Sequence, residues 1–187
     1  MAEIIEISKV DITALARRVK AGEVFIYPTD TVYGIGCDAL NEEAVKKVFE
    51  AKGRDFKKPL SVAFSDMKHL LRFVDINEEQ RREMDAKLPG PYTFVVKNKH
   101  VPKIVTGGLD TVGVRIPKHD LIRELIRESG VPIVTTSTNL SGGPAPSHIY
   151  EIPDEIIEKV SFVIDAGKSG SGKPSTIIDL TTGKKLR

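Results

Sequence analysis

The chain has 187 residues, of which 40% are apolar and 29% are charged, with a formal net charge of +2 and one cysteine, Cys37. The length fits a single domain, the composition excludes the fibrous and disordered classes, and one cysteine excludes an internal disulfide framework. The mild charge argues against an obligate nucleic-acid binder with a concentrated basic surface. No apolar run approaches the ~18 residues of a membrane span, and the chain lacks the basic start of a signal peptide, so we expect a cytoplasmic protein without a membrane partner.

Apolar periodicity and turn residues predict alternating strands and helices, which is typical of an α/β fold with a partly parallel sheet. The last two predicted strands are separated only by a glycine-rich loop, so we expect them to form an antiparallel pair, which makes the sheet mixed. The predicted elements are, in chain order, a strand at 4–7, a helix from Asp11 to Gly22, a strand at 24–27, a helix from Asn41 to Gly53, a strand at 61–65, a helix from Asp66, a helix at 77–87, strands at 92–97 and 112–116, a helix at 119–129, and strands at 132–136, 161–165 and 175–180.

Two polar stretches follow predicted strands. PTDTVYGIG (28–36) joins one strand to a helix as a loop, and TTSTNLSGGPAPS (135–147) begins where the strand ending at Val134 stops. In α/β sheets ligands bind beyond the carboxyl ends of strands, and hydroxyl and backbone N–H groups donate to carboxylate or phosphate oxygens. The same residue types are common in turns, so each stretch alone fits ligand binding and turn chemistry equally well.

Basic residues gather just past the second predicted helix. Cations this close repel one another, which favours an anionic ligand, although a solvated helix end is an equal alternative. The first cluster consists of Lys52, Arg54, Lys57 and Lys58, and a second one of Lys97, Lys99, His100 and Lys103.

Arg115 lies in the predicted strand TVGVRIP. Strand alternation places it on the face opposite Val112 and Val114, where its guanidinium could pair with a carboxylate in a pocket. An arginine that faces solvent is the alternative.

The stretch GKSGSGKPS (167–175) matches part of a phosphate-binding loop. However, Pro174 replaces the Ser or Thr that holds magnesium, and the following residues predict a strand where a P-loop needs a helix N-terminus. These departures argue against a P-loop NTPase.

Six segments, in order, resemble the YrdC-like family of threonylcarbamoyl-adenylate synthases. Each is weak alone, but six in register from about residue 8 onward are specific. The resemblance implies a single YrdC-like domain at 1–187, with a twisted mixed sheet, flanking helices and a concave basic cavity. The segments are PTDTVYGIG, KGR followed by KPL, PGPYTFV, VGVRIP, Ser137-Thr138-Asn139 with LSGGPAPS, and PSTIIDL.

The family activity implied is a nucleotidyltransferase reaction that joins L-threonine, bicarbonate and ATP into threonylcarbamoyl-AMP and pyrophosphate, with Mg²⁺ accompanying ATP. The product supplies the threonylcarbamoyladenosine (t6A) modification of tRNA. The implied partners are therefore the downstream threonylcarbamoyl-transferase complex and, given the basic clusters, tRNA or double-stranded RNA. Such a reaction needs mainly positioning of the substrates and neutralisation of the phosphate charge.

The resemblance also implies roles for individual residues. No metal-ligand motif is present; Asp30, Asp165 and Asp179 are candidates to touch magnesium, and none is favoured. Lys52 and Arg54 are assigned to catalysis, and Tyr33 shapes the amino-acid pocket. ATP binding is assigned to Arg54, Lys58, Thr111, Ser137, Asn139, Ser147 and Arg187, and L-threonine binding to Thr31, Arg115, Thr135 and Ser175.

Two alternatives stay open at this point. One is a tRNA- or double-stranded-RNA-binding module without catalysis, although 6% aromatic residues and no Trp count against single-strand recognition. The other is a paralogous enzyme that takes carbamoyl groups instead of threonine.

Overall fold

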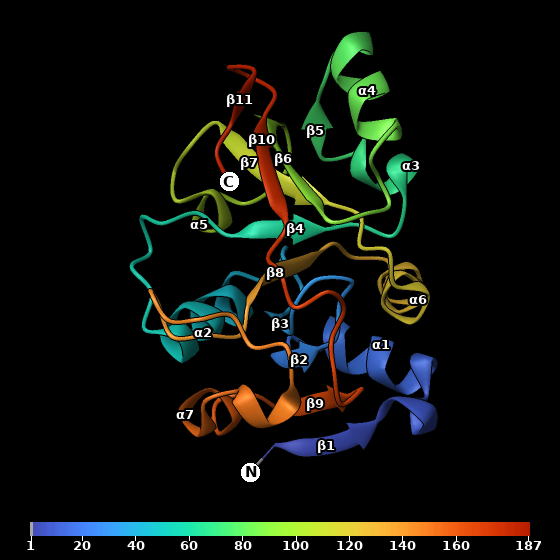
Figure 1. Ribbon diagram of the computed structural model, residues 1–187, viewed down its shortest axis with the longest axis vertical. Helices are drawn as coiled ribbons and strands as arrows, with labels where there is room; N and C mark the ends of the chain where they lie inside the picture. The colour runs from blue at the N-terminus through green and yellow to red at the C-terminus, as the bar shows by residue number, and fades with distance from the viewer. Residues whose placement is uncertain (1) are drawn as a thin grey trace.

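The computed structural model describes residues 2–187 and contains one 11-stranded twisted sheet with helices on both faces (Figure 1). It contains both parallel and antiparallel pairs, so the predicted mixed α/β sheet is confirmed. The strand order is β1 (Glu3–Glu6), β9 (Phe162–Asp165), β2 (Phe25–Tyr27), β3 (Gly34–Gly36), β8 (Ile133–Ser137), β4 (Ser61–Ala63), β7 (Thr111–Arg115), β6 (Tyr92–Asn98), β10 (Thr176–Asp179) and β11 (Lys184–Lys185), with β5 (Val74–Asp75) paired to β6.

Two apolar clusters fix the helices to the sheet. Helices α1 (Ile12–Lys20) and α6 (Asp120–Ser129) pack against each other on one face, where Leu15, Val19 and Leu125 are buried. The larger cluster lies on the other face, beneath α2 (Glu42–Lys52) and α7 (Asp154–Ile157) (Figure 1). The remaining helices are α3 (Met67–Leu70), α4 (Glu78–Asp85), α5 (Lys103–Thr106) and the 3₁₀ turns Ile7–Lys9 and Ile149–Glu151.

The predicted helix starts are confirmed by their caps. Asp11, Asn41, Asp66 and Asn77 each accept a hydrogen bond from the backbone N–H three residues later, which satisfies one free donor of the first turn. Gly53 ends α2 at φ 56°, a left-handed conformation that favours glycine.

The stretch PTDTVYGIG is not wholly a loop, because Gly34–Gly36 forms β3 and pairs antiparallel with β2. Its glycines make this central strand possible: a Cβ atom at Gly36 would lie 2.3 Å from the Val134 carbonyl oxygen. β8 ends at Ser137, one residue beyond the predicted strand at 132–136, so the polar stretch that was placed after Val134 begins inside the strand. At both places residues typical of turns stand in strands.

The expected antiparallel pairing of the last two strands is also wrong. β9 pairs in parallel with β1 and β2 at one edge, whereas β10 pairs in parallel with β6 near the other edge. The glycine-rich segment between them therefore crosses the sheet, and β10 takes β11 as its antiparallel partner. Within residues 2–187, none of the helices has the length and apolar character needed to cross a membrane.

Candidate functional site

A cavity of about 500 Å³ opens over the middle of the sheet. Its walls come from segments far apart in the chain, including the 29–34 stretch, β4, β7, β8 and β10. Of the residues singled out from the sequence, the lining contains Thr31, Tyr33, Arg54, Thr111, Arg115, Thr135, Ser137, Ser175 and Arg187.

The pairing of β4 with β7 and β8 places the residues of the cavity floor side by side. Ser61 of β4 pairs with Thr135 on one side and with Gly113 on the other. Thr111, Gly113 and Arg115 all line the cavity, while Val112 and Val114 are buried in the core, so the predicted alternation of β7 is confirmed. Gly113 keeps the floor open, because a Cβ atom there would lie 2.8 Å from the Ser61 hydroxyl.

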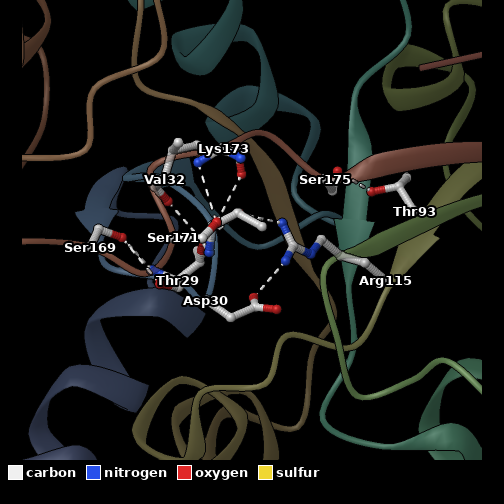
Figure 2. A network of polar contacts seen from close by, with 10 residues as sticks. Thr29, Asp30, Val32, Thr93, Arg115, Ser169, Ser171, Lys173 and Ser175 are labelled. Carbon is white, nitrogen blue, oxygen red and sulfur yellow. Dashed lines mark hydrogen bonds and ion pairs between the residues drawn. The ribbon is translucent and has the colours of Figure 1, made fainter.

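Arg115 lies at the bottom of the cavity, and the alternative of a solvent-facing arginine is wrong. Its Nη2 atom is 2.6 Å from Asp30 Oδ1, and the two side chains are 7% and 11% exposed. Nη1 donates to the Thr31 hydroxyl at 3.2 Å, and that hydroxyl is 2.9 Å from the Thr29 hydroxyl (Figure 2). A buried, oriented guanidinium flanked by hydroxyls suits a small ligand that carries a carboxylate.

Ser175 and Arg187 close the opposite wall. The Ser175 hydroxyl lies 2.8 Å from that of Thr93 in a buried pair (Figure 2). Arg187 donates from Nε to the Ser175 carbonyl at 3.0 Å, and its own carbonyl accepts from Ile177 N, which anchors it beside β10. Burial, and then the nearby charge of Arg115, lowers the pKa of Arg187. The two arginines therefore share one positive region of the cavity.

Lys52 does not line the cavity. It is 2% exposed, and its Nζ donates to the carbonyl oxygens of Ser137 and Asn139, the latter at 2.7 Å. Burial, reinforced by Arg54, lowers its pKa to about 8. The position of Lys52 four residues after Val48 on the buried face of α2 is a sequence signal for this inward orientation. Lys52 thus supports the loop behind Ser137.

The remaining predicted nucleotide residues are held by their neighbours. Arg54 lines the cavity and donates to the carbonyls of Lys58 and Pro59, whereas Lys58 is exposed outside the lining. Asn139 donates to the Leu140 and Gly143 carbonyls, and the Ser147 hydroxyl donates to Glu151. The structure thus places Lys52, Lys58, Asn139 and Ser147 behind or beside the cavity lining.

A metal would find few protein ligands here. Among residues 2–187, no three His, Cys, Asp or Glu side chains form a group that could hold an ion. Asp30 is paired with Arg115, and Asp165 accepts from the Gly167 N–H at 2.7 Å. Asp179 lines the cavity and is the acidic side chain available to it in the described chain. One carboxylate fits Mg²⁺ that arrives with a triphosphate, because this ion keeps several waters and phosphate ligands.

The family model described as "Telomere recombination", the Sua5/YciO/YrdC domain, matches residues 17–187. The chain belongs to this family. A Pseudoalteromonas translucida protein named threonylcarbamoyl-AMP synthase is 37% identical over 180 residues, which cover 94% of each chain. The corresponding Pyrococcus abyssi protein is 41% identical over 165 residues, 87% of this chain and 48% of its own length. The solved structure of P. abyssi Sua5 complexed with L-threonine has 37% identity and a TM-score of 0.88, and the match covers 97% of this chain and 54% of that one.

Sua5/YciO/YrdC membership confirms the resemblance and the fold predicted from the sequence. The Sua5 structure also shows that the chain spans about half the length of some relatives. Sequence reasoning did not find three residues that support the cavity: Asp30, Thr93 and Ser169, whose hydroxyl bonds to the backbone of Thr29. Asp30 was considered only for magnesium, because its partner Arg115 is 85 positions away and nothing local indicates the pair.

Proposed function

We propose that this chain is an L-threonylcarbamoyladenylate synthase. It joins L-threonine, bicarbonate and ATP into threonylcarbamoyl-AMP and pyrophosphate, and so acts as a nucleotidyltransferase. The observation that carries the proposal is the buried Arg115, surrounded by hydroxyls in a 500 Å³ cavity, in a chain whose relatives are named threonylcarbamoyl-AMP synthases.

The amino-acid end of the cavity holds threonine. Arg115 takes the substrate carboxylate with its remaining N–H groups, a planar task that lysine would perform poorly. Thr31, Thr135 and Ser175 offer hydroxyls to the amino and hydroxyl groups of the substrate. Tyr33 donates to the Gly167 carbonyl and accepts from Ala166 N, so its ring forms a fixed wall.

The nucleotide end neutralises phosphate charge. The threonine amine and bicarbonate form a carbamate with loss of water, and a carbamate oxygen then attacks the α-phosphorus of ATP. An O–P bond forms, the bond from the α-phosphorus to the bridging oxygen breaks, and pyrophosphate leaves with that oxygen. Arg54 and Arg187 stabilise the developing charge, Thr111 donates a hydrogen bond, and Ser137, whose hydroxyl donates to Asn139, lines this end. Asp179 would help hold the Mg²⁺ that accompanies ATP, and this ion would supply further charge neutralisation.

The cavity works by positioning. No histidine lines it in the described part of the chain, and the carbamate is already an anionic nucleophile. Holding two substrates in line supplies a large part of such a rate enhancement. The product supplies the t6A modification of tRNA in the cytoplasm, where a threonylcarbamoyl-transferase complex consumes it. The basic clusters offer a binding surface to tRNA.

The experiment that tests this proposal measures pyrophosphate release from ATP in bicarbonate buffer, with and without L-threonine. Release that needs both threonine and bicarbonate is expected, and L-serine should support far less. Release with carbamoyl phosphate in place of threonine would instead assign the chain to carbamoyl-adenylate chemistry. No release, combined with salt-dependent binding of duplex RNA, would indicate a binding module.

A further inference from the structure

The segment GKSGSGK (167–173), which is not a P-loop, packs against the 29–31 stretch of the cavity wall. The Ser169 hydroxyl accepts from Thr29 N at 2.9 Å and donates to the Thr29 carbonyl at 3.1 Å. Ser171 N donates to the Asp30 carbonyl at 3.2 Å, and Gly172 N donates to the Thr31 carbonyl at 2.8 Å. Three successive residues of the wall are thereby tied to one segment, whose Ser169 and Ser171 lie beside Thr29 and Asp30 (Figure 2).

Gly170 lets this segment come so close. It has φ +48°, and a Cβ atom there would lie 2.2 Å from the carbonyl carbon of Asp30 and 2.3 Å from its oxygen. Backbone atoms cannot move aside as the end of a flexible side chain can. Any other residue at 170 therefore displaces the backbone of Asp30.

Asp30 in turn orients Arg115. Its Oδ1 atom is the one carboxylate oxygen within ion-pair distance of the guanidinium among the described residues, and the pair is almost wholly buried. Arg115 Nε and Asp30 Oδ2 are buried without a hydrogen-bond partner in residues 2–187. The orientation of the Arg115 guanidinium therefore depends on this one ion pair and on the weaker contact with Thr31.

We propose that Asp30 is a positioning residue for the substrate carboxylate, and that residues 169–172 hold Asp30 in place. This inference rests on the proposed function and deepens it. Asp30 acts through Arg115 and does not touch the substrate. Electrostatics alone would give the opposite sign, because removal of a carboxylate beside Arg115 makes the site more positive and should tighten an anion. A positioning role instead makes the loss of Asp30 weaken binding, since a misplacement of ~1 Å costs up to about 100-fold.

The test uses Asp30→Asn, which keeps size but loses charge, and Gly170→Ala. The matched control is Gly130→Ala, at the end of α6 with φ +70°, where a Cβ atom meets nothing within 4 Å and no cavity residue is involved. All three variants are checked by thermal unfolding, and the KM values for L-threonine and ATP are measured by pyrophosphate release. We expect the KM for threonine to rise about 10-fold or more in Asp30→Asn and Gly170→Ala, with the KM for ATP within about 3-fold. The control should match the wild type in both.

Three outcomes would overturn the proposal: a KM for threonine that is unchanged or lower in Asp30→Asn, equal rises for threonine and ATP, or the same rise in Gly130→Ala as in Gly170→Ala. If Gly170→Ala does not fold, Asp30→Asn decides alone. A wild-type protein without threonine-dependent release would contradict the proposed function itself, which separates the two failures. In that case, calorimetric titration of threonine into the wild type and Asp30→Asn still tests the positioning role, and an unchanged or tighter threonine affinity in the variant would overturn it.

Discussion

The two ends of the cavity are built differently. At the amino-acid end, Arg115, Asp30 and Thr31 form one buried network whose members contact each other directly. At the nucleotide end, Arg54 and Asn139 bond to carbonyls of their own neighbours, and Ser147 bonds to Glu151. At the first end the side chains that face the ligand contact each other, whereas these three residues of the second end are held within their own loops.

This difference has a physical reason. A small polar amino acid must be selected by fixed donors, because little area is available for binding and misplaced polar groups cost affinity. A triphosphate is large and highly charged, so cationic side chains on flexible loops can bind it without a guanidinium that is fixed in advance. We therefore expect changes at the amino-acid end to affect both stability and threonine use, and changes at the nucleotide end to affect mainly ATP use.

The largest effect is expected for Arg115→Ala. It leaves the Asp30 carboxylate 11% exposed and without a cation, and removal of one member of a buried ion pair typically costs ~3–5 kcal/mol. Threonine-dependent pyrophosphate release should also be lost. Urea unfolding and the steady-state assay measure the two effects. A stability loss below about 1 kcal/mol together with normal threonine use would contradict the account of this end.

A smaller effect is expected for Lys52→Met, which keeps the length of the side chain but removes the donors to Ser137 and Asn139. Two carbonyl groups lose their partner, at about 1–3 kcal/mol in total. The loop behind Ser137 should loosen, which raises the KM for ATP while threonine binding persists. Titration calorimetry with each substrate checks the split, and an equal loss of both would break the distinction between the two ends.

The same lysine predicts a pH effect on stability. Burial lowers the pKa of Lys52 from 10.5 to about 8. Between these values the unfolded chain holds more protons than the folded one, so stability rises with pH through this window, and the penalty of the buried charge remains below it. The free energy of unfolding of the wild type, minus that of Lys52→Met, should therefore increase from about pH 7.5 to about pH 10, by on the order of 1 kcal/mol or more. A flat or falling difference would show that the amine is not penalised by burial.

The smallest effect is expected for Asn139→Ala. Its amide donates to the Leu140 and Gly143 carbonyls in an exposed loop, so the stability cost should be about 1 kcal/mol or less. The KM for ATP should rise several-fold because the loop loses its shape, and the KM for threonine should not change. Ser147→Ala is the matched comparison on the same loop, and a larger change in KM for threonine than for ATP in either variant would contradict the assignment.

Much of the fold could be predicted from local chemistry. Helix caps such as Asp11 and Asn41 act within four residues, and strand alternation located Arg115 on the cavity face of β7. Gly34–Gly36 gave no strand pattern, because its role is to let a ring and a carbonyl approach closely in three dimensions. β9 and β10 were predicted to pair because strands that are neighbours in sequence often do. The glycine-rich segment between them instead crosses the sheet, so that β9 pairs with β2 and β10 pairs with β6.

The site followed a similar pattern. Arg115, Thr31 and Ser175 could be predicted to share a cavity because the family segments that contain them were recognisable. Lys52 was assigned to catalysis from the family resemblance, although its place on the apolar face of α2 indicates burial. Asp30 could not be paired with Arg115 from sequence, since only the sheet topology brings them within 2.6 Å.

The central claim is that one end of the cavity binds the amino-acid carboxylate and the other end binds phosphate. The most direct test is titration calorimetry of L-threonine, without ATP, into the wild type, Arg115→Lys and Arg54→Lys. Both substitutions keep the charge and lose the planar fork. The account predicts that Arg115→Lys loses threonine affinity by about 10-fold or more, while Arg54→Lys binds as the wild type does. Equal affinities in the two variants would contradict it.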